Sequence, residues 1–367
     1  MTKIGAVTDP ATFRAQFPVF QRKAYLNAGT EGPLPRAAAD AVRERIESEV
    51  TAGRCGRDYM ESVRELATEL RAGYARTLHA DPSDIALTGS TTDGCNTILS
   101  GLDLRPGDQI VTSDEEHPGL LAPLGRLKRA GIEVRVAPFA EIAEAVGPST
   151  RLVAVSHVSW VSGLVVDTDA LTATGVPFLL DAAQSIGAVP ADVEELGCAF
   201  YAGSGQKWMC GPEGSGALYV HRDQLDELNV PWPGYMSVAD PLHALDSGPA
   251  EDAARLDHGF PPGVRSAWAL ASLNVLEDAG WEWVHARAAT LAASLADQLA
   301  ERGLEVGPRG RCTLVSWKVD DPDAEVARLA QEGVVVRSIL SHGLVRASVG
   351  AWCSEEELDR LVSLAAA

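Results

Sequence analysis

The feature that most constrains the fold is a series of short, continuous apolar runs separated by longer segments. Leu152–Val155 and Phe178–Leu180 contain no polar side chain. Strands have this pattern when helices cover both faces of their sheet, because neither face then meets water. We therefore predict an α/β fold for the first two-thirds of the chain, with a mostly parallel central sheet and helices on both faces. Its strands are expected at 85–88, 109–112, 133–137, 152–156, 178–181 and 217–220.

The pattern changes after about residue 255. Residues 281–303 carry an apolar stripe at helical spacing, and 313–319 alternates like a half-buried strand. Ser354 and Glu357 have the spacing of a capping box, which predicts the start of a last helix. Further elements are expected as a helix at 323–332 and strands at 334–337 and 344–349.

The length of 367 residues suggests two or three domains. We predict a large α/β domain over 16–255. Residues 1–15 and 256–367 are expected to form a smaller α+β domain.

The charge balance restricts the partners. With 31 Lys and Arg against 51 Asp and Glu, the net charge is −20, which argues against nucleic acid and anionic membranes as partners. No run approaches the roughly 20 apolar residues of a membrane span. Residues 1–10 lack the apolar core of a signal peptide. We therefore expect a cytoplasmic protein.

Several common enzyme motifs are missing from the sequence. There is no dinucleotide fingerprint after a strand, P-loop, H-E-x-x-H or G-x-S-x-G. The eight histidines show no metal-ligand spacing, so no metal site is expected. The six cysteines include no C-x-x-C pair, and we expect reduced, mostly buried thiols.

Two segments carry residues suited to chemistry. Asp181 ends the apolar run at 178–180, and ligands of open α/β sheets bind at the carboxyl ends of strands. A buried carboxylate there needs a cationic partner, although a helix N-cap is the simpler explanation for Asp181 alone. Lys207 lies in the glycine-rich segment 202–216, which allows close backbone approach to a ligand. A lysine among apolar neighbours has a lowered pKa and can act as a nucleophile, whereas the alternative is an ordinary surface lysine.

The two segments together resemble a known family. Asp181 with Gln184, followed by Ser204 with Lys207, is similar to the aminotransferase class V branch of fold-type I pyridoxal-phosphate (PLP) enzymes. That branch includes cysteine desulfurases, cystine and cysteine C–S lyases, kynureninase and isopenicillin-N-epimerase-like proteins. The resemblance extends from residues 25–29 to the closing helix and implies PLP as the cofactor.

The resemblance implies roles around the cofactor ring. Lys207 would bind PLP covalently and then move protons at Cα and Cβ of the substrate. Asp181 would pair with the pyridine nitrogen, which makes the ring an electron sink. Gln184 would bond the phenolic oxygen, Ala183 would pack on one ring face, and His117 would stack on the other. Without this pattern, His117 is simply a loop histidine.

The cofactor phosphate is expected at a helix start. Ser90, Thr91 and Thr92 follow the strand at 85–88, and free N–H groups at a helix N-terminus suit a phosphate. The family places the phosphate on the equivalents of Thr91, Thr92 and Ser204. Gln206 replaces the usual histidine and can still donate a hydrogen bond. The alternative for these hydroxyls is ordinary helix capping.

Substrate contacts follow from the same resemblance. Arg346 matches the arginine that binds the substrate α-carboxylate, for which a planar bidentate donor is suited. Asn27 and Trp160 are predicted at the substrate, and Trp160 is also predicted to contact the cofactor. The alternatives are a strand-edge surface arginine and a tryptophan that only packs.

The sequence departs from the desulfurases at several places. Their nucleophilic cysteine lies on a loop that corresponds here to 338–343, which is short and has no cysteine, while Cys353 lies beyond Arg346. Trp160 stands where desulfurases usually have Asn, and cystine lyases resemble this chain there. Phe260 replaces a threonine that, in relatives, reaches the phosphate of the neighbouring subunit.

These features predict a PLP-dependent enzyme that acts on an α-amino acid by α,β-elimination at a carbon–sulfur bond. Its products would be pyruvate, ammonia and a thiol or persulfide. An aminotransferase or epimerase on the same scaffold is the alternative, and a binding protein that has lost catalysis is a further one. Persulfide formation on an enzyme cysteine is disfavoured. We expect a homodimer with active sites near the subunit interface.

Overall fold

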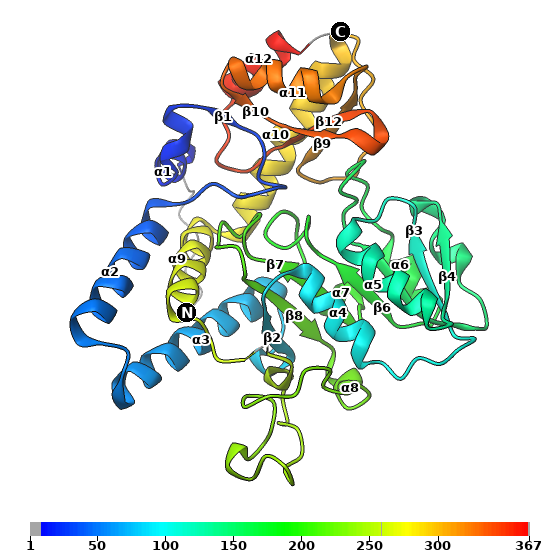
Figure 1. Cartoon of the computed structure of the whole chain (residues 1–367). Helices are drawn as coiled ribbons and strands as arrows, with labels where there is room; N and C mark the ends of the chain where they lie inside the picture. Colours follow the sequence, from blue (N-terminus) through cyan, green and yellow to red (C-terminus); the bar gives the residue numbers. More distant parts are fainter. Residues whose placement is uncertain (1–8, 258, 366–367) are drawn as a thin grey trace.

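The computed structural model describes residues 9–257 and 259–365 (Figure 1). Its central sheet has seven strands, and β8 is antiparallel to both of its neighbours while all other pairs are parallel. The predicted α/β class and mostly parallel sheet are therefore confirmed. In spatial order the strands are β2 (Ile85–Thr88), β8 (Gly216–Val220), β7 (Phe200–Ser204), β6 (Phe178–Asp181), β5 (Thr150–Ser156), β3 (Gln109–Ser113) and β4 (Glu133–Ala137).

Helices cover both faces of this sheet, as the apolar runs predict. In β6, Phe178 and Leu180 belong to one apolar cluster, together with residues of the helices at 56–78, 168–173, 193–196 and 263–279. Leu179 belongs to another cluster, together with residues of the helices at 91–101 and 118–129 on the opposite face. Alternate strand residues point to opposite faces, so a strand covered on both sides needs apolar residues at every position. The helices are α1 (Pro10–Ala15), α2 (Arg36–Ala52), α3 (Gly56–Leu78), α4 (Thr91–Gly101), α5 (Pro118–Arg129), α6 (Thr168–Ala173), α7 (Val193–Leu196), α8 (Arg222–Leu225), α9 (Gly263–Ala279), α10 (Trp281–Glu301), α11 (Pro322–Gln331) and α12 (Glu355–Leu364).

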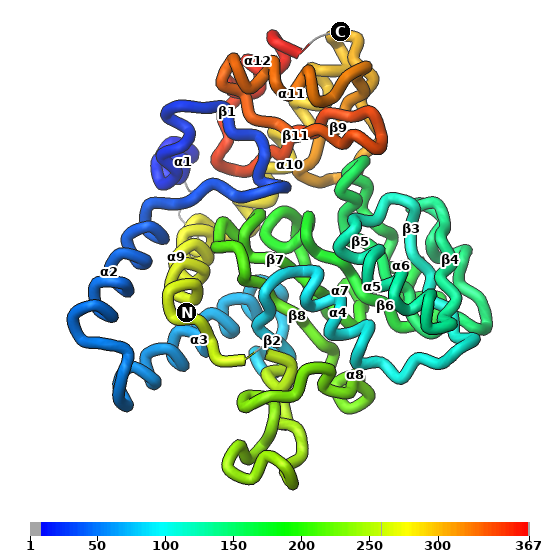
Figure 2. The backbone as a smooth tube through the Cα atoms, viewed as in Figure 1, coloured from blue at the N-terminus to red at the C-terminus, as the bar shows by residue number. Residues whose placement is uncertain are grey.

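The C-terminal part forms a second, antiparallel sheet in the order β11 (Arg337–Ile339), β12 (Leu344–Ser348) and β9 (Leu314–Lys318). The tube in Figure 2 places it beyond one end of the large sheet, beside α10, α11 and α12. The predicted strand at 334–337 is divided, because β10 (Val334–Val335) instead pairs with β1 (Ala24–Tyr25) near the N-terminus. The capping box of Ser354 and Glu357 is confirmed at the start of α12.

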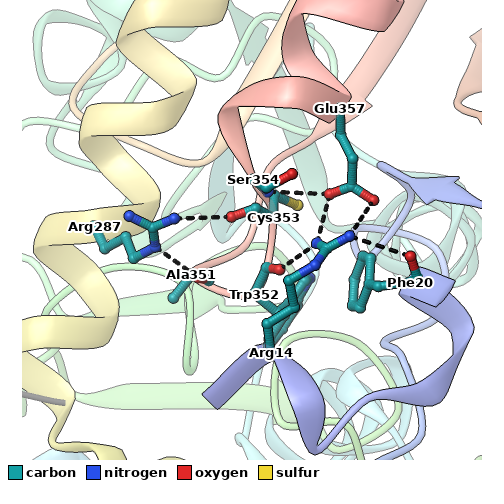
Figure 3. A network of polar contacts seen from close by, with 8 residues as sticks. All are labelled: Arg14, Phe20, Arg287, Ala351, Trp352, Cys353, Ser354 and Glu357. Atoms are coloured by element: carbon teal, nitrogen blue, oxygen red, sulfur yellow. Dashed lines mark hydrogen bonds and ion pairs between the residues drawn. The ribbon is translucent and has the colours of Figure 1, made fainter. Parts of the chain in front are cut away.

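The N-terminal helix is attached to this C-terminal unit (Figure 3). Arg14 donates to both carboxylate oxygens of Glu357, at 2.7 and 3.0 Å, and to the carbonyl oxygen of Trp352 at 2.8 Å. Phe13 and Phe17 pack against Trp352. Helix α9 packs instead against α2 and α3. The domain division at 15/16 and 255/256 stays a prediction, and residues 1–8 of its N-terminal part lie outside the described residues, as does most of the segment considered for a signal peptide.

The cysteines are unpaired, and five of the six are buried, as expected; Cys55 is exposed. Among the described residues, no helix is long and apolar enough to cross a membrane. The same part of the chain contains no group of three His, Cys, Asp or Glu residues placed to hold a metal.

Candidate active site

A cavity of about 240 Å³ lies between the carboxyl ends of five large-sheet strands and the small sheet. All eleven predicted cofactor residues and Arg346 line this cavity. Parallel strands end at the same edge of a sheet, so the loops after β2, β3, β5, β6 and β7 converge there. The lining residues are Gly29, Thr30, Glu31, Ser90, Thr91, Thr92, His117, Trp160, Asp181, Ala183, Gln184, Ser204, Gln206, Lys207, Arg337 and Arg346.

One end of the cavity is suited to an anion. Ser90 caps α4 by accepting a hydrogen bond from the amide of Asp93 at 3.1 Å, and Ser90, Thr91 and Thr92 at the start of α4 line the cavity. The hydroxyl oxygens of Thr91 and Ser204 are buried and have no hydrogen-bond partner among the described residues. Buried hydroxyls require a partner, and a helix N-terminus favours negative charge.

Lys207 and Asp181 form the charged floor of the cavity. Burial lowers the pKa of Lys207 to about 8, with Asp181 opposing the shift and the charges of Arg346 and Arg337 adding to it. Burial raises the pKa of Asp181, opposed by the Ala183 amide, which donates to its Oδ1 at 3.0 Å, and by the Lys207 charge. A lysine with this pKa is neutral to roughly a tenth near pH 7, far more than an ordinary lysine, and its neutral form can act as a nucleophile or base.

Gln184 connects the floor to the N-terminal loop. Its Nε2 donates to the carbonyl oxygen of Gly29 at 2.8 Å, and its Oε1 accepts from the indole of Trp208 at 3.1 Å. Gly32 donates its amide to the carbonyl oxygen of Gln206 at 2.7 Å. The loop at 29–32 is therefore packed directly onto the segment that carries Lys207.

His117 lies on the wall of the cavity as the N-cap of α5. Its Nδ1 accepts the amide of Gly119 at 3.0 Å, and its ring meets Trp160 edge-on with centroids 5.1 Å apart. Partial burial and the positive charges of Lys207 and the two arginines lower the pKa of His117 to about 4. The ring is therefore neutral at pH 7, which suits stacking on a ligand.

Arg346 is almost completely buried, with 1% of its surface exposed. Its Nη1 donates to the carbonyl oxygen of Trp160 at 2.7 Å, while its Nε has no partner among the described residues. Burial, together with Arg337, lowers the pKa of Arg346 to about 9. A buried guanidinium with an unused donor provides a binding site for a carboxylate.

Arg337 is a lining residue that the sequence reasoning missed. It pairs with Arg346 across β11 and β12, so both side chains reach the same cavity. Its Nη1 donates to the hydroxyl of Thr30 at 3.0 Å. The available signal was the hairpin, whose short turn at Leu340–His342 places residues 337 and 346 opposite each other.

The structure does not place Asn27 at the cavity wall. Its Oδ1 accepts the hydroxyl of Thr30 at 2.8 Å, and Thr30 in turn holds Arg337. Asn27 therefore reaches the site through two other residues, and its role as a direct substrate contact stays a prediction.

The cysteines and Phe260 lie apart from this lining. None of the six cysteines lines the cavity, and Cys353 is buried beside the Arg14–Glu357 pair, where its carbonyl accepts from Arg287 (Figure 3). Phe260 lines a separate cavity near Thr88 and Gly89.

Comparison with known proteins identifies relatives across nearly the whole chain. The family described as aminotransferase class V matches residues 24–361. A probable cysteine desulfurase of Methanothermobacter thermautotrophicus is 28% identical, covering 95% of both chains. Isopenicillin N epimerase of Streptomyces clavuligerus is 32% identical over 65% of this chain and 62% of its own length.

Solved structures agree with these sequence relationships. The cystine C–S lyase C-DES, in complex with its reaction product cysteine persulfide, superposes with a TM-score of 0.90 at 30% identity, covering 95% of this chain and 98% of C-DES. A C-DES mutant with the same score has glycine covalently linked to its PLP cofactor. From the extent of the family match and the fold it shares with C-DES, the chain belongs to the aminotransferase class V family.

Proposed function

We propose that this protein is a PLP-dependent enzyme that cleaves the carbon–sulfur bond of cystine, cysteine or an S-substituted cysteine by α,β-elimination. The observation that carries the proposal is a cavity that unites Lys207, Asp181 and Arg346 but has no cysteine in its lining. A desulfurase needs a thiol there to accept the sulfur, whereas a lyase does not. The likeness to C-DES supports the same reaction class.

The donor set of the cavity fits PLP. Thr91, Ser204 and the first turn of α4 would hold the phosphate, since their donors face the cavity and the two hydroxyls lack partners. Asp181 would hold the ring nitrogen, and Ala183 and His117 would flank the ring. When bound, PLP supplies an electron sink that stabilises negative charge at Cα of the substrate.

Arg346 and Lys207 have different roles toward the substrate, one in binding and the other in proton transfer. Arg346 would bind the α-carboxylate through paired N–H donors and thereby orient the Cα–H bond. The Lys207 amine, whose pKa burial lowers to about 8, would in its neutral form remove the Cα proton and return a proton later. The Cβ–S bond then breaks, and the sulfur group leaves with a proton as a thiol or persulfide. Water hydrolyses the released 2-aminoacrylate to pyruvate and ammonia.

Arg337 adds a second cation to the same cavity and supports a preference within the substrate class. Two arginines on adjacent strands suit a substrate with two carboxylates. L-cystine carries two, whereas an S-alkylcysteine carries one. We therefore expect cystine to be the better substrate.

An aminotransferase or epimerase is the second candidate. Lys207, Asp181 and Arg346 serve those reactions equally well, and the 32% identity to an isopenicillin N epimerase favours keeping this alternative.

The experiment that separates these reactions supplies the PLP-loaded enzyme with L-cystine or S-methylcysteine. Pyruvate, ammonia and the released sulfur product (a persulfide from L-cystine, a thiol from S-methylcysteine) are measured separately, with and without an added 2-oxo acid. Elimination gives the three products in equal amounts without the oxo acid. Amino transfer that depends on the oxo acid, with neither thiol nor persulfide released, would overturn the proposal. Lys207→Ala is the control and should reduce turnover to background.

A further inference from the structure

We infer that Glu115 is a positioning residue for Arg346, acting through the loop at residues 159–163, here called the junction loop. Glu115 precedes the Glu116–His117 pair and does not line the cavity. The inference rests on the proposed function, because it takes Arg346 as the group that binds the substrate carboxylate.

The first step is the attachment of Glu115 to the junction loop. Its Oε2 accepts the hydroxyls of both Ser159 and Ser162, the latter at 2.6 Å. Both serines are buried, with 0% and 6% of their surfaces exposed. Hydrogen bonds that end on a carboxylate are stronger than neutral ones, so one side chain fixes both ends of the turn.

The second step is the internal order of the loop. The Ser159 Oγ also accepts the amides of Val161 and Ser162, each at 3.1 Å. Ser159 therefore donates to Glu115 while it accepts from two amides of the turn. These bonds define the orientation of the peptide groups at 160–162, which includes the Trp160 carbonyl.

The third step is the contact of the loop with the small sheet. Arg346 donates to the carbonyl of Trp160 at 2.7 Å, and Ser316, its partner across β12 and β9, donates to the carbonyl of Val161 at 2.6 Å. Gly163 accepts from the Cys312 thiol at 3.0 Å. Three carbonyls of the loop thus accept hydrogen bonds from donors of the C-terminal unit, while two of its serine hydroxyls donate to Glu115.

These contacts explain how the half-buried carboxylate of Glu115 can determine the orientation of the buried Arg346 guanidinium. The Trp160 carbonyl occupies one Nη of Arg346, which determines where the remaining donors point. If Glu115 is removed, the serines lose their charged acceptor and the turn gains freedom. Arg346 then loses orientation while Lys207 and the phosphate end remain unchanged.

The test measures ligand binding to the PLP-loaded enzyme by the change in cofactor absorbance. Glycine is the probe with a carboxylate, and glycinamide is the matched probe without one. Glu115→Ala should weaken glycine binding about tenfold, as for loss of a charge-assisted hydrogen bond. Glycinamide affinity should change less than about twofold, because Arg346 does not recognise it. Glu141→Ala, an exposed carboxylate on the same domain, is the control.

A second pair of variants keeps the inference falsifiable if Glu115→Ala folds poorly. Ser162→Ala removes one donor only and should weaken glycine binding by a smaller factor. In an Arg346→Lys background, Glu115→Ala should add less than about twofold, since both act through one contact. Unchanged glycine binding, equal weakening of both probes, or a full tenfold effect in the Arg346→Lys background would overturn the inference. Glycine binding does not require C–S cleavage, so these outcomes are independent of the lyase proposal.

Discussion

Opposing influences act on the pKa of the Lys207 amine, and their balance determines when it can react. Burial and two nearby arginines favour the neutral amine, whereas Asp181 favours the charged form. Only the neutral amine attacks a carbonyl or accepts a proton. The balance places its pKa at about 8, within about one unit of neutral pH, and a catalytic base is most effective when its pKa lies near the pH of the reaction.

This balance predicts the pH dependence of cofactor capture by the apoprotein. The rate of PLP binding, followed by stopped-flow absorbance, should rise through about pH 8 and level off above it, because the amine is neutral above its pKa. Asp181→Asn removes the charge that favours protonation and should move the midpoint to lower pH. A midpoint near the ordinary lysine value of about 10.4 would contradict the assignment.

Not every residue that lines the cavity can be predicted from its local sequence pattern. Lys207, Asp181 and Arg346 lie in distinctive sequence patterns that predicted them as site residues, and all three line the same cavity. Arg337 has no such pattern, and its place in the cavity depends on pairing between two short strands. Asn27 has the expected neighbours in sequence; its Oδ1 accepts the hydroxyl of Thr30, and its predicted substrate contact stays a prediction.

At the scale of elements, the site depends on one loop packed against another. The loop at 29–32, between β1 and α2, contacts the segment after β7, and a Cβ on Gly32 would overlap the carbonyl oxygen of Lys207. A backbone oxygen cannot move aside as a side-chain end can, so the Lys207 segment itself would have to shift.

Gly32→Ala is therefore expected to lower kcat/KM by about 100-fold, the size of effect that a misplacement of roughly 1 Å produces. PLP affinity should fall as well, and both are measured on the purified variant. Gly147→Ala is the matched control, because a Cβ there meets nothing within 4 Å. Equal behaviour of the two variants would show that the loop contact is unimportant.

The strands differ in how well their positions can be predicted from the sequence. The strand β7 was not predicted, because Gly203 and Ser204 are weak strand formers and its order comes from pairing with β6 and β8. The division of the 334–337 segment into β10 and β11 arises because its two halves pair with different partners. Local pattern contains no information about such partners.

At the scale of the whole molecule, the N-terminal helix α1 packs against the C-terminal unit. Arg14 is three-quarters buried and pairs with a Glu357 side chain that is 9% exposed. Removal of one partner from a buried pair leaves an uncompensated charge, which is far more destabilising than loss of a surface pair. The N-terminal segment therefore helps to hold the unit that carries Arg346.

We expect Arg14→Ala to destabilise the protein by about 2 kcal/mol, less than for a fully buried pair because Arg14 is partly solvated. Urea unfolding followed by fluorescence measures the change. Arg43→Ala is the matched control, since its pair with Asp40 is 73% and 52% exposed and should contribute less than about 0.5 kcal/mol. Similar midpoints for the two variants would contradict the structural role of the contact.

The homodimer stays a prediction, which light scattering of the purified protein can test.

The sequence by itself determined the class of fold, most strand positions, the last three helices, and the residue set that indicates class V chemistry. It could do so because covered strands need apolar runs and because reactive residues lie in recognisable local patterns. Only the tertiary structure decided which residues surround the cavity together. Strand pairing and packing between segments far apart in sequence bring Arg337 and Thr30 to the cavity and Glu115 to the junction loop. A local sequence pattern contains no information about which distant segments will pack together.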